Sequence, residues 1–146
     1  MADLDPGVTQ KADGIAKPWN ILGQTYVAKS LCESSFSWDA TFPPGTFVPP
    51  HQHPDQDEFI LMHSGTFDLV LDGKETSATA GDLIKLPRGI MHGIFNKSDA
   101  PVHCFFWVSP TQKLYDLFTK IDGVADPERV VALAAEHNIH FAPPPA

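Results

Sequence analysis

The chain has 146 residues, a length that fits one domain with a buried core. Hydrophobic residues make up 42% and charged residues 19%, which is typical of a folded protein and argues against disorder. The formal net charge of −8 argues against nucleic acid and anionic membrane surfaces as partners, because both call for basic patches.

The chain shows no targeting or membrane segment. Its first residues are acidic and lack the apolar region of a signal peptide, and no apolar run approaches the ~20 residues of a membrane-spanning helix. We therefore expect a cytoplasmic protein without a membrane partner.

Taken in order, the chain predicts a loosely structured arm, many short strands and then two helices. Residues 1–18 form the arm. Residues 36–42 alternate strictly between apolar and polar side chains, the pattern of a half-buried strand. Further strands are predicted over residues 19–31, 46–53, 58–63, 65–71, 75–80, 83–86, 92–96 and 102–108. Frequent proline and glycine between these short runs favours an all-β barrel over a helical bundle.

The hydrophobic period changes after residue 108. Ser109-Pro110-Thr111-Gln112 has the form of a capping box with proline at the first helical position, and a second helix is predicted from Asp126 to near residue 138. We expect both helices to pack against the outside of the barrel. The predicted divisions are an arm (1–18), a β-barrel (19–108) and a helical extension with a proline-rich tail (109–146).

The first chemically informative segment is Gly45-x5-His51-x-His53-x4-Glu58-x6-Gly65. On a strand the side chains alternate, so His51 and His53 project from the same face. A polar turn separates them from Glu58, and a hairpin would bring this carboxylate back beside the two imidazoles.

The second segment is Gly81-x5-Pro87-x-Gly89-x2-His92-x3-Asn96. Pro87 sets φ just before Gly89, and we expect this turn to aim His92 at the same centre.

Together the two segments supply three imidazoles and one carboxylate, a ligand set for one divalent transition metal ion. The predicted ligands are His51, His53, Glu58 and His92. Imidazole and carboxylate suit Fe, Mn, Ni, Co, Cu and Zn alike, so the identity of the ion stays open. The ordinary alternative for a single histidine is a core or surface residue, and we apply it to His63, His103, His137 and His140.

These segments resemble the paired motifs of the cupin superfamily, with every fixed position present. The resemblance implies an antiparallel cupin β-barrel (a double-stranded β-helix, or jelly roll) of six to eight strands with the metal inside. Within that superfamily the chain resembles small single-domain proteins described as quercetinase-like, or flavonol dioxygenase-like.

Strand parity predicts what else faces the ion. Phe47 shares a face with the first histidine pair, Ile60 and Met62 share one with Glu58, and Ile94 shares one with His92. Phe36 and Trp38 are possible further walls. Each of these residues could equally fill the core, but together they favour an apolar or aromatic small-molecule substrate.

Three functions follow as hypotheses. The first is a metal-dependent dioxygenase that uses O2 on a small aromatic or enolic substrate, with Glu58 as both ligand and general base. The second is a lyase, isomerase or cyclase that stabilises an enolate without O2. The third is a non-catalytic small-molecule-binding module. An exposed sheet edge would need cover, so we expect a homodimer.

Overall fold

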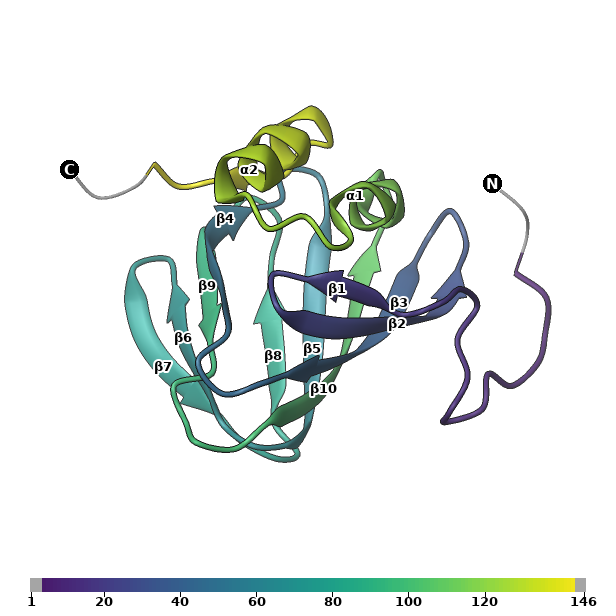
Figure 1. The fold of residues 1–146 in the computed structure, drawn as a ribbon, viewed down its shortest axis with the longest axis horizontal. Helices are drawn as coiled ribbons and strands as arrows, with labels where there is room; N and C mark the ends of the chain where they lie inside the picture. The colour runs from purple at the N-terminus through teal and green to yellow at the C-terminus, as the bar shows by residue number, and fades with distance from the viewer. Residues whose placement is uncertain (1–3, 144–146) are drawn as a thin grey trace.

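The computed structural model describes residues 4–143, and it shows two antiparallel β-sheets stacked face to face with two short helices across one end (Figure 1). The larger sheet has the order β1-β2-β3-β10-β5-β8. Its strands are β1 (Trp19–Ile21), β2 (Gln24–Leu31), β3 (Phe36–Phe42), β10 (Val102–Ser109), β5 (Asp57–Ser64) and β8 (Leu83–Leu86). The smaller sheet has the order β11-β4-β9-β6-β7. Its strands are β11 (His140–Phe141), β4 (Phe47–Gln52), β9 (His92–Phe95), β6 (Phe67–Leu71) and β7 (Lys74–Ala78).

The core lies between the two sheets and is rich in aromatic side chains. The alternation of β3 buries Phe36, Trp38 and Phe42, as predicted. The register of β3 against β10 sets Trp38 opposite Phe106, and their rings stack at 5.0 Å. Burial of such large aromatic side chains supplies most of the driving force for folding.

The two sheets do not close into the predicted barrel. The strands form two separately hydrogen-bonded sheets, a jelly-roll sandwich of eleven strands within residues 4–143 rather than a continuous barrel of six to eight. Two strand boundaries also differ. The predicted strand 19–31 is broken at Leu22 and Gly23, where both residues have positive φ and the chain reverses. The short strand β11 was not predicted, because its two residues carry no periodic pattern.

The first helix begins later than predicted. Helix α1 spans Leu114–Ile121, and its N-cap, Lys113, makes no capping side-chain bond. Gln112 has a φ of 49°, which no helix accommodates, and the Thr111 hydroxyl donates to the carbonyl of Cys32. The capping-box interpretation was therefore wrong.

Helix α2, Pro127–Glu136, has the predicted start. The Asp126 carboxylate accepts from the Glu128 amide at 3.0 Å, and Pro127 occupies the first helical position. Among the residues that the structure describes, no helix is long and apolar enough to cross a membrane.

Both helices lie over one end of the sandwich, with α2 above β4 and α1 next to β1 (Figure 1). The prediction placed them against the outer surface instead. Both helices contribute buried side chains to the internal cavity described below: Leu117 and Phe118 from α1, and Val130 from α2. The helices therefore close the end of the sheets.

The predicted arm contains no strand or helix over residues 4–18, and its residues are mostly exposed. Lys29 of β2 holds it by donating to the carbonyls of Gln10 at 3.1 Å and Lys11 at 3.0 Å. The predicted proline-rich tail lies partly outside the described residues.

Candidate metal centre

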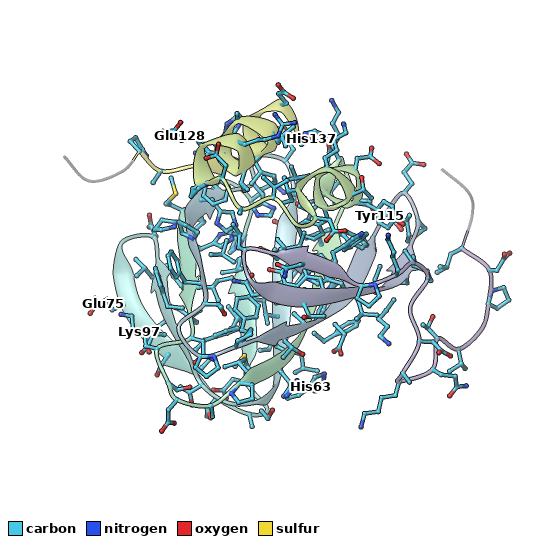
Figure 2. The ribbon with its side chains drawn as sticks, in the orientation of Figure 1. His63, Glu75, Lys97, Tyr115, Glu128 and His137 are labelled. Atoms are coloured by element: carbon cyan, nitrogen blue, oxygen red, sulfur yellow. The ribbon has the colours of Figure 1, made fainter. Side chains whose placement is uncertain are left out.

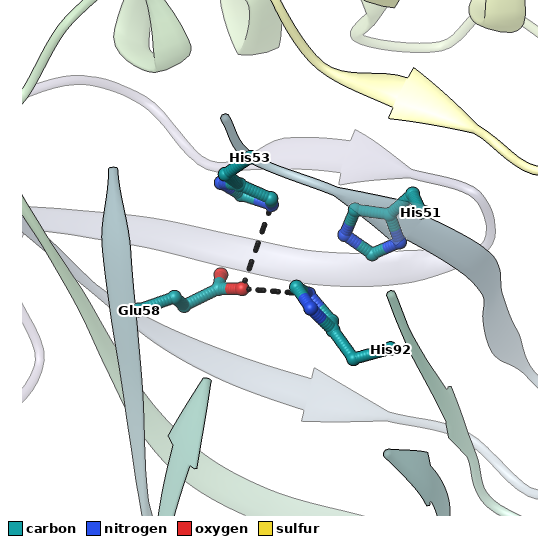
Figure 3. A group of neighbouring side chains, drawn as sticks. All are labelled: His51, His53, Glu58 and His92. Carbon is teal, nitrogen blue, oxygen red and sulfur yellow. Dashed lines mark ion pairs between the residues drawn. The ribbon is translucent and has the colours of Figure 1, made fainter. Parts of the chain in front are cut away.

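The four predicted ligands meet at one point between the sheets (Figure 3). His51 lies on β4 directly opposite His92 on β9, and His53 follows the end of β4. Glu58 reaches them from β5 of the other sheet. All four residues are buried, and their candidate ligand atoms lie within 4.8 Å of one another. The cluster fits a cupin metal site.

Several polar atoms at this point lack a partner within the protein. The Glu58 Oε2 atom lies 3.2 Å from His92 Nε2 and 3.6 Å from His53 Nε2. None of these three buried atoms makes a hydrogen bond of acceptable geometry. Unpartnered buried polar groups are costly, and a bound cation would give these three atoms a partner, so the residues fit a metal ion.

The opposite nitrogen of each imidazole is held in place. His51 Nδ1 lies 2.8 Å from the Pro49 carbonyl, and His92 Nδ1 lies 3.1 Å from that of Ile90. A carbonyl only accepts, so each Nδ1 carries the hydrogen and each Nε2 keeps its lone pair for the centre.

Gln56 orients the third imidazole, and sequence reasoning missed it. Its Nε2 donates to the carbonyls of Pro110 at 3.0 Å and Thr111 at 2.8 Å, which turns its Oε1 toward His53 Nδ1 at 2.6 Å. In the sequence Gln56 belongs to a polar turn, the usual sign of an exposed residue, yet it is 2% exposed. Only the contact with a segment far along the chain reveals its role.

The charge state of the cluster suits a divalent cation. Burial lowers the pKa of His51 well below its ordinary value, and it also lowers the pKa of His53. Burial alone would raise the pKa of Glu58, but His53 and His92 outweigh it and hold that pKa below its usual value. Neutral imidazoles beside a carboxylate are what a metal ion requires.

The other histidines whose ordinary role we predicted lie outside this cluster. His63 is exposed at the end of the sandwich away from the helices (Figure 2). His137 lies between the helices, with its Nε2 2.9 Å from Lys120 Nζ.

A small, mostly apolar cavity of about 50 Å³ adjoins the cluster. The sheets contribute Tyr26, Trp38, Val48, Ile94 and Phe106 to its walls. Across it lie residues of α1, α2 and β11, among them Phe141, whose ring lies 5.1 Å from that of His51. The space holds only a few water molecules.

The residues predicted to face the ion divide into three groups. Trp38 and Ile94 line the cavity. Phe36, Ile60 and Met62 are fully buried in the core and are not among its lining residues.

Phe47 does not face the cluster, contrary to the expectation from strand parity. It is 47% exposed and stacks on Phe95 at 5.7 Å. The register of β4 against β9 shifts between Val48 and His51, so a bulge at the two prolines breaks the parity, and Val48 faces inward instead.

The chain belongs to the cupin superfamily: residues 38–109, about half of it, match the Cupin domain family model. Protein SchB of Streptomyces halstedii is 27% identical over 84 residues, which cover 58% of this chain and 61% of that protein. Tetracenomycin polyketide synthase protein TcmJ of Streptomyces glaucescens is 27% identical over 77 residues, 53% of this chain and 52% of that one. The chain thus spans little more than half the length of these two relatives.

Solved structures agree on the fold. An RmlC-like cupin from Shewanella frigidimarina has a TM-score of 0.67 at 17% identity, covering 77% of this chain and 97% of that one. KdgF from Halomonas sp. has a TM-score of 0.60 at 22% identity, covering 64% of this chain and 84% of that one.

Proposed function

We propose that this protein is a metal-dependent enzyme acting on a small, largely apolar or aromatic substrate that carries an enolisable oxygen. The observation that carries the proposal is the set of unpartnered buried atoms on His53, Glu58 and His92 beside an apolar cavity. His51 would complete the ligand set. A bound Fe, Mn, Ni, Co, Cu or Zn ion would supply Lewis-acid stabilisation of an enolate oxygen.

The protein's own residues account for the rest of the chemistry. Three imidazoles with fixed Nδ1 hydrogens would hold the ion, and the Glu58 carboxylate would take the proton of a substrate hydroxyl. The apolar walls exclude water, which strengthens each electrostatic interaction inside. The Glu58 carboxylate is the one group among the proposed ligands that can act as the general base.

For the reaction, we propose dioxygenation of an enolised aromatic substrate, as expected from the chain's resemblance to quercetinase-like proteins. Four protein ligands leave one or two positions on a five- or six-coordinate ion, and a site of this kind can admit substrate. The aromatic walls formed by Trp38 and Phe106 favour a planar, flavonol-like substrate over a small charged one.

A second candidate is a non-oxidative isomerisation or cyclisation at the same site. It is favoured by the relatives, because TcmJ and the CurC protein of Streptomyces cyaneus, 25% identical over 108 residues, are both described as polyketide synthase proteins. Cyclisation of an enolisable chain uses a base and no O2, and an enolate-stabilising ion would assist it.

The experiment begins with metal content, measured by elemental mass spectrometry on untagged protein. The loaded protein is then assayed with flavonols and aromatic 1,3-diketones, with and without O2. We expect near-stoichiometric metal and substrate-dependent oxygen uptake that disappears in His51→Ala, falls sharply in Glu58→Gln and persists in His63→Ala. Turnover that continues without O2 would replace dioxygenation by the non-oxidative reaction. Binding without any turnover would make the protein a binding module, and failure to bind metal would reject the proposal.

The homodimer, the cytoplasmic location and the divisions after residues 18 and 108 also stay predictions. Light scattering on the eluting protein tests the first of them.

A further inference from the structure

Two polar side chains in the wall of the apolar cavity are not used by the candidate metal centre. Trp38 on β3 is 1% exposed and Tyr26 on β2 is 3% exposed. Both line the same cavity as His51, His53 and Glu58. Their hydrogen-bonding groups differ in kind, and each has capacity that the protein leaves unused.

The Trp38 indole offers a donor. Its ring is held between Phe36, stacked at 4.8 Å, and Phe106, stacked at 5.0 Å, so it has little freedom to turn. Its Nε1 atom is buried and has no hydrogen-bond partner. A buried indole N–H usually finds an acceptor, so this one is free for a ligand atom.

The Tyr26 hydroxyl offers an acceptor. Gln24 donates through Nε2 to the carbonyls of Leu22 at 3.3 Å and Phe47 at 3.2 Å, which fixes its amide so that Oε1 must accept. Tyr26 donates its hydrogen to that Oε1 at 2.9 Å. The hydrogen of the phenol is therefore committed, and its oxygen keeps lone pairs that can accept.

We infer that Trp38 and Tyr26 form a second polar subsite that recognises a hydroxyl group of the substrate. The two rings lie 5.9 Å apart, and a hydroxyl can accept from one residue and donate to the other. This inference rests on the proposed function. It narrows the substrate class to small aromatic molecules that carry both an enolisable oxygen for the metal and a separate phenolic or alcoholic hydroxyl.

The test measures binding to the Zn²⁺-loaded protein by calorimetry. The parent probe is 2-hydroxy-1,4-naphthoquinone, which has an enolic hydroxyl beside a carbonyl, and it is compared with derivatives bearing one hydroxyl or one methoxy group on the benzo ring. At one ring position we expect the hydroxyl to tighten binding about tenfold through its two buried hydrogen bonds. A methoxy group at the same position accepts but cannot donate, so it should retain only the part of the gain in affinity that comes from Trp38.

Variants assign the two contacts. Trp38→Phe should abolish the gain in affinity from the methoxy group and leave the hydroxyl only the gain that comes from Tyr26, while preserving the aromatic stack. Tyr26→Phe should remove the difference between hydroxyl and methoxy. Trp107→Phe is the matched control, since Trp107 stacks on Phe59 at 5.2 Å and is not among the cavity's lining residues. Thermal unfolding checks that each variant is folded.

The outcomes separate the two proposals. If the parent probe binds the zinc-loaded protein but no ring hydroxyl tightens binding, or the full gain from the hydroxyl survives in Trp38→Phe, the subsite is rejected and the metal-anchored function stands. If the parent probe and all its derivatives fail to bind, both proposals fall.

Discussion

At the scale of single residues, the candidate centre depends on which atom each side chain presents. Nε2 of each histidine faces the cluster because a carbonyl or an amide oxygen holds the other nitrogen. For His53 the acceptor is the side chain of Gln56. Gln56 in turn donates to two carbonyls of the turn before α1. Geometry at the centre is therefore sensitive to a residue that is not a ligand.

Replacement of Gln56 should weaken metal binding. Gln56→Met keeps the side-chain length but leaves His53 Nδ1–H without an acceptor, so we expect metal affinity to fall about 10–100-fold. A competition titration against a chelating dye measures it. Gln52→Met makes the same substitution at the last residue of β4 and should leave the affinity near wild type. Equal affinity in both variants would show that Gln56 does not support the centre.

Two turn glycines, Gly65 and Gly73, differ in the space around their Cα atoms. Gly65 has a φ of +86°, and an added Cβ would lie 2.8 Å from a Val102 methyl and 2.9 Å from the Pro101 carbonyl. Gly73 has a similar φ of +78° with nothing within 4 Å. Gly73→Ala should cost about 1–2 kcal/mol of unfolding free energy from backbone strain alone. Gly65→Ala should cost about 1–3 kcal/mol more from overpacking. Urea titrations compare them, and equal losses would contradict the close contact.

At the scale of secondary-structure elements, the helices and β11 decide how open the cavity is. Leu117 of α1, Val130 of α2 and Phe141 of β11 all form its wall, and β11 holds to β4 through only two paired positions. A cavity of about 50 Å³ is far below the ~300 Å³ or more of a typical ligand site. Binding of an aromatic substrate therefore requires these elements to move apart.

The capped start of α2 gives a test at this scale. Asp126→Ala removes the acceptor for the Glu128 amide and should lower the unfolding free energy by about 1 kcal/mol. Amide hydrogen exchange should accelerate in α2 more than in the core strand β3. Asp126→Ser should restore most of the loss, and Asp99→Ala, at an exposed loop position, should change little. Unchanged amide exchange in α2 would show that the Asp126 cap does not stabilise this helix.

At the scale of the whole molecule, the buried cluster links folding to metal and to protons. An ion that binds the folded chain and not the unfolded one stabilises it by mass action, by about 2.7 kcal/mol when free metal is at 100 times its dissociation constant. We expect the melting temperature to fall on chelation and to recover when metal is restored. The variant His92→Ala should show no such recovery, and a wild-type melting temperature indifferent to metal would contradict the site.

The metal-free protein should lose stability in acid. An unfolded histidine has a pKa near 6.5, and burial lowers the pKa of His51 and His53 in the folded state. The unfolded chain then binds protons that the folded chain excludes. This stability is therefore complete above about pH 6.5 and is lost as the pH falls toward the folded pKa values. The slope should reach at most about 1.4 kcal/mol per pH unit for each histidine.

Chemical denaturation at several pH values measures this loss. His51→Leu should flatten the dependence, whereas His63→Ala, which changes an exposed imidazole, should leave it unchanged. Metal-loaded protein should keep its stability to lower pH, until protons displace the ion. A flat profile for the metal-free wild type would contradict the buried, neutral state of these histidines.

The sequence by itself was enough to predict that the four candidate ligands gather in one buried cluster, the mostly-β class and the strand of alternating residues 36–42. These features depend on local spacing: two histidines two residues apart share a face, and glycine and proline mark the turns between short strands. The start of α2 was likewise readable, because Asp126 and Pro127 act within one turn of the helix.

Only the tertiary structure decided the features that depend on distant contacts or on a break in a periodic pattern. Strand parity failed for Phe47 because a bulge at two prolines shifted the register of β4. Gln56 became a buried partner of His53 through carbonyls contributed by the turn before α1. The helices close the cavity because their apolar faces pack over one end of the two sheets. Such outcomes arise from how separate elements pack, and local sequence spacing carries no record of that packing.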